Sequence, residues 1–224
     1  MKIAEPHQTK QAFWRQTMTY ITGRKKVEEF LGFLVEGGKI LSDDPSFYKT
    51  FPNLAEIAVP FLGDWFSIDL LFNSGRVQNI AEKHIADLDS EHIKKLRRSF
   101  RPFTQIDIEG NQKVIIAKKP IAYKTNSFLT SESAASILFD LEVQSALIIP
   151  LTLPNGCIGS IEILSLKESR GYDAADLALA EELARRISLA VERSLLYYAN
   201  HTINKNIFPK KSTPYLKENI ENKL

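Results

Sequence analysis

The chain has little of several features that would define a function directly. One cysteine among 224 residues excludes an internal disulfide and a zinc site built from several cysteines. The 29 basic and 27 acidic residues give a net charge of +2, so no overall field favours nucleic acid or an acidic membrane surface. No apolar run approaches the ~20 residues that span a bilayer. The polar N-terminus does not resemble a signal peptide. We therefore expect a cytoplasmic protein with no nucleic-acid partner and no membrane span.

Motifs of the common enzyme classes are also missing. The sequence contains no Gly-x-Ser-x-Gly elbow, no phosphate-binding glycine loop and no His-Glu-x-x-His. His7, His84, His92 and His201 are scattered, and no pair has the four-residue spacing that places two imidazoles on one helix face. The sequence therefore predicts no catalytic residue and no metal ligand. We expect His84, at the end of a predicted strand, to be structural, with a haem or metal ligand as the alternative.

The composition is that of a globular protein with a sizeable core, 44% hydrophobic and 25% charged. Its clearest pattern lies in residues 145–197, where two apolar strand-like runs flank Asn155-Gly156. That dipeptide favours the positive φ angles of a tight hairpin turn. A helix follows, with Asp173 as its expected N-cap and Asp176 three residues later.

This C-terminal helix is apolar on two faces. One face runs through Ala180, Ala184, Ile187, Val191 and Leu195, and a second through Leu179, Leu183 and Ala190. The sheet can cover one face, so the other predicts a further partner. We expect a homodimer held by the terminal helices, because Ile187, Val191, Leu195 and Tyr198 advance in coiled-coil steps. The alternative is that the second face packs on helix 27–41 or on residues 10–23 of the same chain.

Strands joined by hairpins, with helices at both ends, predict an α+β fold. The expected domain spans residues 26–200, after an N-terminal extension (1–25) that could be helical and before a polar, flexible tail (201–224). Within the domain we expect helices at 27–41, 53–62, 89–100, 131–141 and 174–200. We expect strands at 64–72, 76–84, 120–123 and 145–151, and a further strand after Asn155-Gly156. Residues 114–117 read as a short helix or strand.

The hairpin, the link Arg170-Gly171-Tyr172-Asp173 and the following Asp-Leu-Ala-Leu-Ala-Glu-Glu-Leu-Ala-Arg-Arg resemble the end of a bacterial GAF domain of the sensor histidine kinase and phosphatase type. Ala58-Val59-Pro60 and residues 64–71 extend the resemblance upstream. It implies a PAS-related antiparallel sheet with the N- and C-terminal helices on one face. On the other face, a lid formed by residues 101–143 would close over a pocket.

The resemblance also implies a function. GAF-like modules are non-catalytic sensory units of signal transduction, including two-component systems. They bind a small molecule, dimerise, or do both, and act on an output domain or on a partner protein in trans. The chain is therefore either a stand-alone module or a piece of a longer sensor. The alternatives are a purely structural dimerisation module without ligand, and a sensor that binds haem or a chromophore. No cofactor is assigned, and the Asn-Lys-Phe-Asp-Glu signature of cyclic-nucleotide-binding members is not evident.

The candidate ligand-binding residues are polar or aromatic side chains of two predicted strands. Alternation separates Trp65, Ser67 and Asp69 from the apolar Phe66, Ile68 and Leu70. Ser160 and Glu162 repeat the serine–carboxylate spacing on another strand. In GAF-like topology these strands are neighbours, so Trp65, Ser67, Asp69, Ser160 and Glu162 would face the lid. The alternative for this face is an ordinary solvated surface.

Cys157, the single cysteine, is expected to be a small buried hydrophobe. Bilin-binding GAF domains attach their chromophore through a different, loop-borne cysteine motif. GAF-type methionine sulfoxide reductases need several cysteines. Both comparisons argue against these activities here.

Overall fold

A computed structural model describes residues 6–71, 77–85, 91, 93–94, 118–124, 143–166 and 171–204. The chain divides into two compact units, Met1–Gly38 and Lys39–Leu224. The first unit contains most of α1 (Pro6–Asp43), and the second contains the sheet and the other helices. Among the described helices, none is long and apolar enough to cross a membrane.

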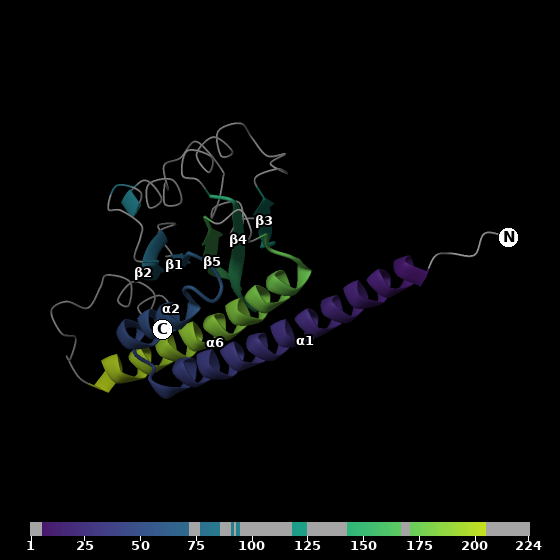
Figure 1. Cartoon of the computed structure of the whole chain (residues 1–224). Coiled ribbons are helices and arrows are strands. Elements are labelled where there is room, and N and C mark those ends of the chain that lie inside the picture. Colours follow the sequence, from purple (N-terminus) through teal and green to yellow (C-terminus); the bar gives the residue numbers. More distant parts are fainter. Residues whose placement is uncertain are drawn as a thin grey trace. The chain divides into compact units, whose positions relative to one another are not determined.

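The second unit is built on a five-stranded antiparallel sheet (Figure 1). Its strands are β1 (Trp65–Leu71), β2 (Val77–His84), β3 (Ile121–Lys124), β4 (Ser145–Leu153) and β5 (Gly156–Ser165). The order across the sheet is β2-β1-β5-β4-β3. The N-terminal hairpin β1–β2 thus pairs directly with the C-terminal hairpin β4–β5, which confirms the α+β prediction.

One face of the sheet is apolar and covered by helices. Phe66, Ile68, Leu147, Ile161 and Ile163 are all buried on it. The helix α2 (Phe47–Ala58) packs on β1 and β2, and α6 (Ala174–Asn204) packs on β4 and β5. Figure 1 shows both helices along the same side of the sheet. Burial of these side chains is the main source of stability for this layer.

The predicted cap of α6 is present. One carboxylate oxygen of Asp173 accepts hydrogen bonds from the amides of Ala175 (2.8 Å) and Asp176 (2.9 Å). In return, the Asp173 amide donates to the Asp176 side chain at 2.9 Å. This reciprocal arrangement satisfies amides that the helix itself leaves without acceptors.

Both predicted apolar faces of α6 are buried within this one chain. The buried side chains are Leu179, Ala180, Leu183, Ala184, Ile187, Ala190, Val191 and Leu195. The dimer was expected because one apolar face of α6 would remain uncovered. In the structure neither of these two faces is uncovered, so this argument for a dimer is lost. The helix instead exposes Leu189, Leu196 and Tyr197.

The hairpin turn differs from the prediction by one residue. Leu153 pairs with Gly156, so Pro154 and Asn155 form the turn, and Gly156 begins β5. Proline fixes its own φ near −65° and favours the first central position of a turn. Gly156 still has a positive φ of 142°. The sequence therefore located the hairpin but not its register.

Helix boundaries differ as well. The helix expected at 27–41 is part of the longer α1, which includes residues 6–25 and continues through Gly32, Gly37 and Gly38. The helix expected at 53–62 is α2, which begins at Phe47 and ends before Pro60. The extent of the domain stays a prediction, as does the position of residues 27–38 beside α6. The expected segments 101–117 and 131–141, and the tail beyond Asn204, lie outside the described residues.

Candidate functional site

The sheet register brings four predicted site residues together. Ser67 pairs with Glu162 and Asp69 pairs with Ser160 across the β1–β5 ladder. Directly opposed residues in an antiparallel ladder point to the same face. The opposite face is the one covered by α2, because Lys83 pairs with Phe66 and its side chain binds Glu56 of α2. Ser67 and Asp69 alternate with Phe66 and therefore point away from α2. We call Ser67, Asp69, Ser160 and Glu162 the buried polar cluster.

These four side chains are not on a solvated surface, which was the alternative considered from the sequence. Their exposed fractions are 1% for Ser67, 0% for Asp69, 0% for Ser160 and 2% for Glu162. The Ser67 hydroxyl donates to Glu162 Oε2 at 3.1 Å and lies 3.5 Å from Asp69 Oδ2. A serine has one hydroxyl hydrogen, so it can donate fully to only one of the two carboxylates. The shorter distance favours Glu162.

Trp65 extends the cluster toward one end of β1. Trp65 is 2% exposed, and in the sheet it lies opposite Leu164 of β5 and His84 of β2. The indole and imidazole rings stack with centroids 5.7 Å apart. His84 Nδ1 lies 2.9 Å from the carbonyl oxygen of Ile85, so a hydrogen on Nδ1 would donate to it. These contacts support the structural role expected for His84.

The indole Nε1 of Trp65 and the hydroxyl of Ser160, both buried at this face, have no hydrogen-bond partner within the described part of the chain. The first is a donor only, whereas the second can donate and accept. Buried polar groups in proteins nearly always have partners, and each exception needs a reason. A ligand at this face would supply one.

Backbone irregularities flank the cluster on both sides. A bulge shifts the β1–β2 register between Ile68 and Asp69, and the Asn79 side chain donates across it to the carbonyls of Ile68 (3.2 Å) and Ala81 (3.0 Å). Gly159, with φ +155°, approaches Asp69 so closely that an added Cβ would lie 2.1 Å from its carbonyl oxygen. Bulges and close backbone approaches are features that re-aim side chains near sites.

Asp64 is an important residue that sequence reasoning missed. Its buried carboxylate accepts from the Ser165 hydroxyl (3.2 Å) and the Leu166 amide (2.9 Å). Its backbone binds Leu164 and Ile85 as well. Asp64 thus fixes the entry to β1 between β2 and β5, directly beside Trp65. An isolated aspartate before a strand gives no sequence signal for this role.

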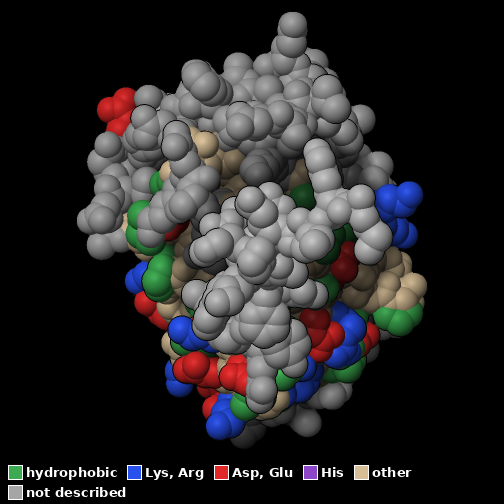
Figure 2. Space-filling model, turned by 45° about the vertical axis from the view of Figure 1, so that its right-hand side comes forward, with side chains coloured by type: hydrophobic (Ala, Val, Ile, Leu, Met, Phe, Trp, Pro, Cys, Tyr) green, Lys and Arg blue, Asp and Glu red, His purple; other side chains and the backbone are tan. Residues whose placement is uncertain are grey.

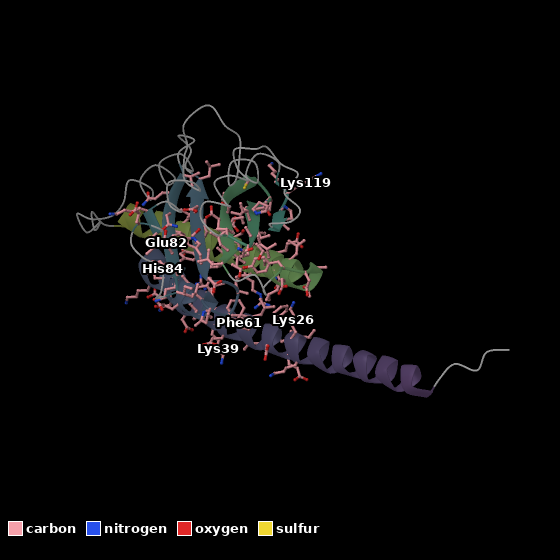
Figure 3. All side chains as sticks on the ribbon, turned by 45° about the horizontal axis from the view of Figure 1, so that its top comes forward. Lys26, Lys39, Phe61, Glu82, His84 and Lys119 are labelled. Atoms are coloured by element: carbon pink, nitrogen blue, oxygen red, sulfur yellow. The ribbon has the colours of Figure 1, made fainter. Side chains whose placement is uncertain are left out.

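Glu82 was also missed. It pairs with Ser67 and therefore lies on the face of the cluster, two residues from His84 (Figure 3). Alternation along residues 77–84 shows which side chains share a face with Glu82. Only the pairing of β1 with β2 shows that this is also the face of Ser67. Within the part of the chain that the structure describes, no group of three His, Cys, Asp or Glu side chains could hold a metal ion.

Cys157 is half-buried and lies on β5, where its thiol donates to the carbonyl of Gly159 at 3.2 Å. Burial raises the pKa of the thiol, and the hydrogen bond and Lys118 only partly oppose this. A raised pKa disfavours the reactive thiolate. The environment therefore agrees with a packing role, although the side chain is less buried than the sequence predicted.

Comparison with known proteins identifies the fold. No protein-family model and no curated protein matches the chain. Solved structures do match. A phycocyanobilin-bound GAF domain from a cyanobacterial phytochrome is 12% identical, with a TM-score of 0.56 over 75% of this chain and 96% of that one. The chain has the fold of a GAF domain.

Two further solved structures are similar to the chain. The GAF domain of PixJ from Thermosynechococcus elongatus, in its blue-light absorbing form, is 17% identical, with a TM-score of 0.51 over 74% of this chain and 94% of that one. A free methionine-R-sulfoxide reductase from Neisseria meningitidis, in complex with its substrate, is 14% identical, with a TM-score of 0.56 over 75% and 91%. At such identities the likeness concerns the fold, because one fold hosts many functions.

Proposed function

We propose that this chain is a non-catalytic sensory module of bacterial signal transduction that binds a small molecule at the buried polar cluster. The observation that carries the proposal is the burial of Ser67, Asp69, Ser160 and Glu162 on one sheet face, opposite the helices. Convergent polar groups in an otherwise apolar setting are typical of small-molecule sites. Trp65 completes the proposed site at one end.

The GAF fold supports a sensory role, and the molecules named with two similar structures support a small-molecule site. One is named for a bound phycocyanobilin and another for a complex with its substrate. A non-enzymatic role is supported by the single cysteine, since its thiol environment disfavours the thiolate. We further propose a cytoplasmic location and a two-component type of pathway, in which the module acts on an output domain or a partner in trans.

We also propose that two copies associate through their terminal helices. Leu189 and Leu196 are 49% and 52% exposed and lie seven residues apart on α6, the spacing of a coiled-coil seam. On α1, Val27, Leu31 and Val35 are exposed at four-residue intervals. A second copy would cover such apolar stripes and carry a change at the sheet along the helices.

Native mass spectrometry of the full chain, purified without heating or denaturant, tests the small-molecule proposal. The expected result is a bound mass that denaturation releases. Ser160→Ala should reduce its occupancy, whereas Ser188→Ala should not. Ser188 is the matched control because it is an equally buried serine whose hydroxyl binds the Ala184 carbonyl within α6. Bound mass unaffected by Ser160→Ala, or lost equally in both variants, would contradict this site.

A further inference from the structure

The charge of the buried polar cluster indicates which class of molecule it binds. Two of its four side chains are carboxylates, and the Ser67 hydroxyl lies within 3.5 Å of both. Glu82 adds a third carboxylate to the same face, through its pairing with Ser67. The surface in Figure 2 intersperses Lys and Arg with Asp and Glu. Among its own four residues, by contrast, the buried polar cluster has two carboxylates and no basic side chain.

Acidic residues alone would not define a site, but two further groups converge on this one. Ser160 Oγ is fully buried, pairs with Asp69 and has no hydrogen-bond partner within the described residues. Trp65 Nε1 is equally without a described partner. The hydroxyl can accept from a ligand, and the indole can only donate to one. By the strand register, both residues lie on the sheet face that holds the two carboxylates.

We infer that the cluster binds a small organic cation, an ammonium or amidinium compound that also carries a hydrogen-bond acceptor. The inference rests on the proposed small-molecule function and adds the charge of the ligand. The cationic group would donate to Asp69 and Glu162, and the acceptor would receive the Trp65 indole hydrogen. Charge-assisted hydrogen bonds of this kind are about twice as strong as neutral ones.

A bare metal ion is a poorer match for the same atoms. A metal ion only accepts electron pairs, so the indole N–H at the end of the cluster could not serve as a ligand. An anionic ligand would meet the carboxylates at close range, and like charges repel strongly in a buried setting. A cation with several donor hydrogens fits both the carboxylates and the hydroxyls.

Charge-matched probes test this inference on the full chain. Benzylamine and benzamidine are the cations, benzyl alcohol is the neutral probe, and benzoate is the anion. Thermal unfolding and calorimetric titration should show binding of the cations, with benzyl alcohol and benzoate at least ~10-fold weaker. Glu162→Gln and Asp69→Asn keep the side-chain shape and should weaken the cations about 10- to 100-fold.

Glu56→Gln is the matched control, since Glu56 is a carboxylate of α2 whose side chain is 61% exposed and binds Lys83. It should leave cation binding unchanged. If benzyl alcohol or benzoate binds as well as the cations and Ser160→Ala weakens it, the small-molecule site stands and the cation inference is wrong. If Glu162→Gln and Glu56→Gln affect the cations equally, the cations bind elsewhere and the inference is also wrong. If no probe binds and no bound mass is found, the proposed function fails with it.

Discussion

At the scale of single residues, Gly159 shows how the backbone beneath the cluster is constrained. Any Cβ at this position would lie 2.1 Å from the Asp69 carbonyl oxygen and 3.0 Å from the Leu70 Cα, and φ is +155°. We expect Gly159→Ala to cost more than about 3 kcal/mol of unfolding free energy, because both contacts are with backbone. Urea denaturation measures the change.

Gly156 provides the comparison. Its φ is +142°, yet an added Cβ would meet nothing within 4 Å. Gly156→Ala should therefore cost only about 1 kcal/mol, the price of an unfavourable φ. Equal losses in the two variants would mean that strain in φ, and not the contact with Asp69, makes Gly159 necessary.

Glu182 gives a pH-dependent prediction. Hydrogen bonds from Arg185 and Arg186 lower its pKa to about 2. A lowered pKa in the folded state stabilises the fold above the ordinary value near 4.5, and this contribution is lost as the pH falls toward 2. The side chain is 32% exposed, so solvent screening limits the effect to about 0.5–1 kcal/mol.

We expect Glu182→Gln to lower the unfolding free energy by that amount at pH 7, and the difference from the unmodified chain to shrink between pH 4.5 and 2. Denaturant unfolding at several pH values measures it. Glu181→Gln, at the exposed neighbouring position, should show a smaller change. A difference independent of pH would rule out the ion pairs as its cause.

Much of the candidate site follows from alternation along single strands. That pattern separates Ser67 and Asp69 from Phe66 and Ile68, and the structure confirms the separation. Burial of the cluster and the Ser67–Glu162 hydrogen bond depend on which strands pair and in which register. The sequence of a single strand does not specify either. Asp64 went unrecognised for the same reason, since its partners lie about 100 residues away in sequence.

At the scale of elements, α6 is the helix whose packing was predicted best. Ile187 is fully buried, and Leu189 on the same helix is 49% exposed. Ile187→Asp should cost about 3–5 kcal/mol, because an uncompensated charge would enter the core. Leu189→Asp should cost less than about 1 kcal/mol. Thermal or urea unfolding compares them, and similar losses would contradict the packing described for α6.

The C-terminal carbonyl groups of α1 receive hydrogen bonds from a residue of another helix. The last turn of α1 contains no basic residue, and the guanidinium of Arg193 in α6 donates to the carbonyls of Leu41 and Ser42. Cations stabilise helix C-termini by about 0.3–1 kcal/mol. We expect Arg193→Gln to reduce stability by that amount and to raise hydrogen exchange at residues 39–43. Unchanged exchange there would mean that the contact contributes nothing.

Element boundaries were predicted less well than element types. The helix expected at 27–41 contains Gly32, Gly37 and Gly38, yet α1 runs unbroken from Pro6 to Asp43. Glycine lowers helix propensity by only about 1 kcal/mol per residue, so other interactions can override it. Pro150 has no N–H to donate to a ladder, and proline is therefore confined to edge strands and bulges of a sheet. Pro150 lies in β4 beyond the last described β3 partner, Ile148, where no described β3 residue requires its missing N–H.

At the scale of the molecule, the hairpins and their helices predicted the α+β class, and the resemblance of residues 58–71 and 145–197 to GAF domains predicted the GAF fold. The same pattern did not predict the association state, because the two apolar faces of α6 are both buried within one chain. If two copies associate, light scattering at micromolar concentration should give twice 25.4 kDa. Leu189→Glu with Leu196→Glu should return the mass to 25.4 kDa without loss of stability. A single-chain mass for the unmodified protein at all concentrations would show that the dimer proposal is wrong.

The central claim is that a small molecule binds at the buried polar cluster, and the indole N–H of Trp65 reports on it directly. The chain has two tryptophans, so Trp14→Phe assigns the Trp65 indole signal in a proton–nitrogen NMR spectrum. The full chain would be titrated with benzylamine and with any compound released from the purified protein. The account predicts a saturable shift of the Trp65 indole signal that Glu162→Gln weakens and Glu56→Gln preserves. A Trp65 signal that stays fixed while either compound binds elsewhere, or while neither binds, would contradict it.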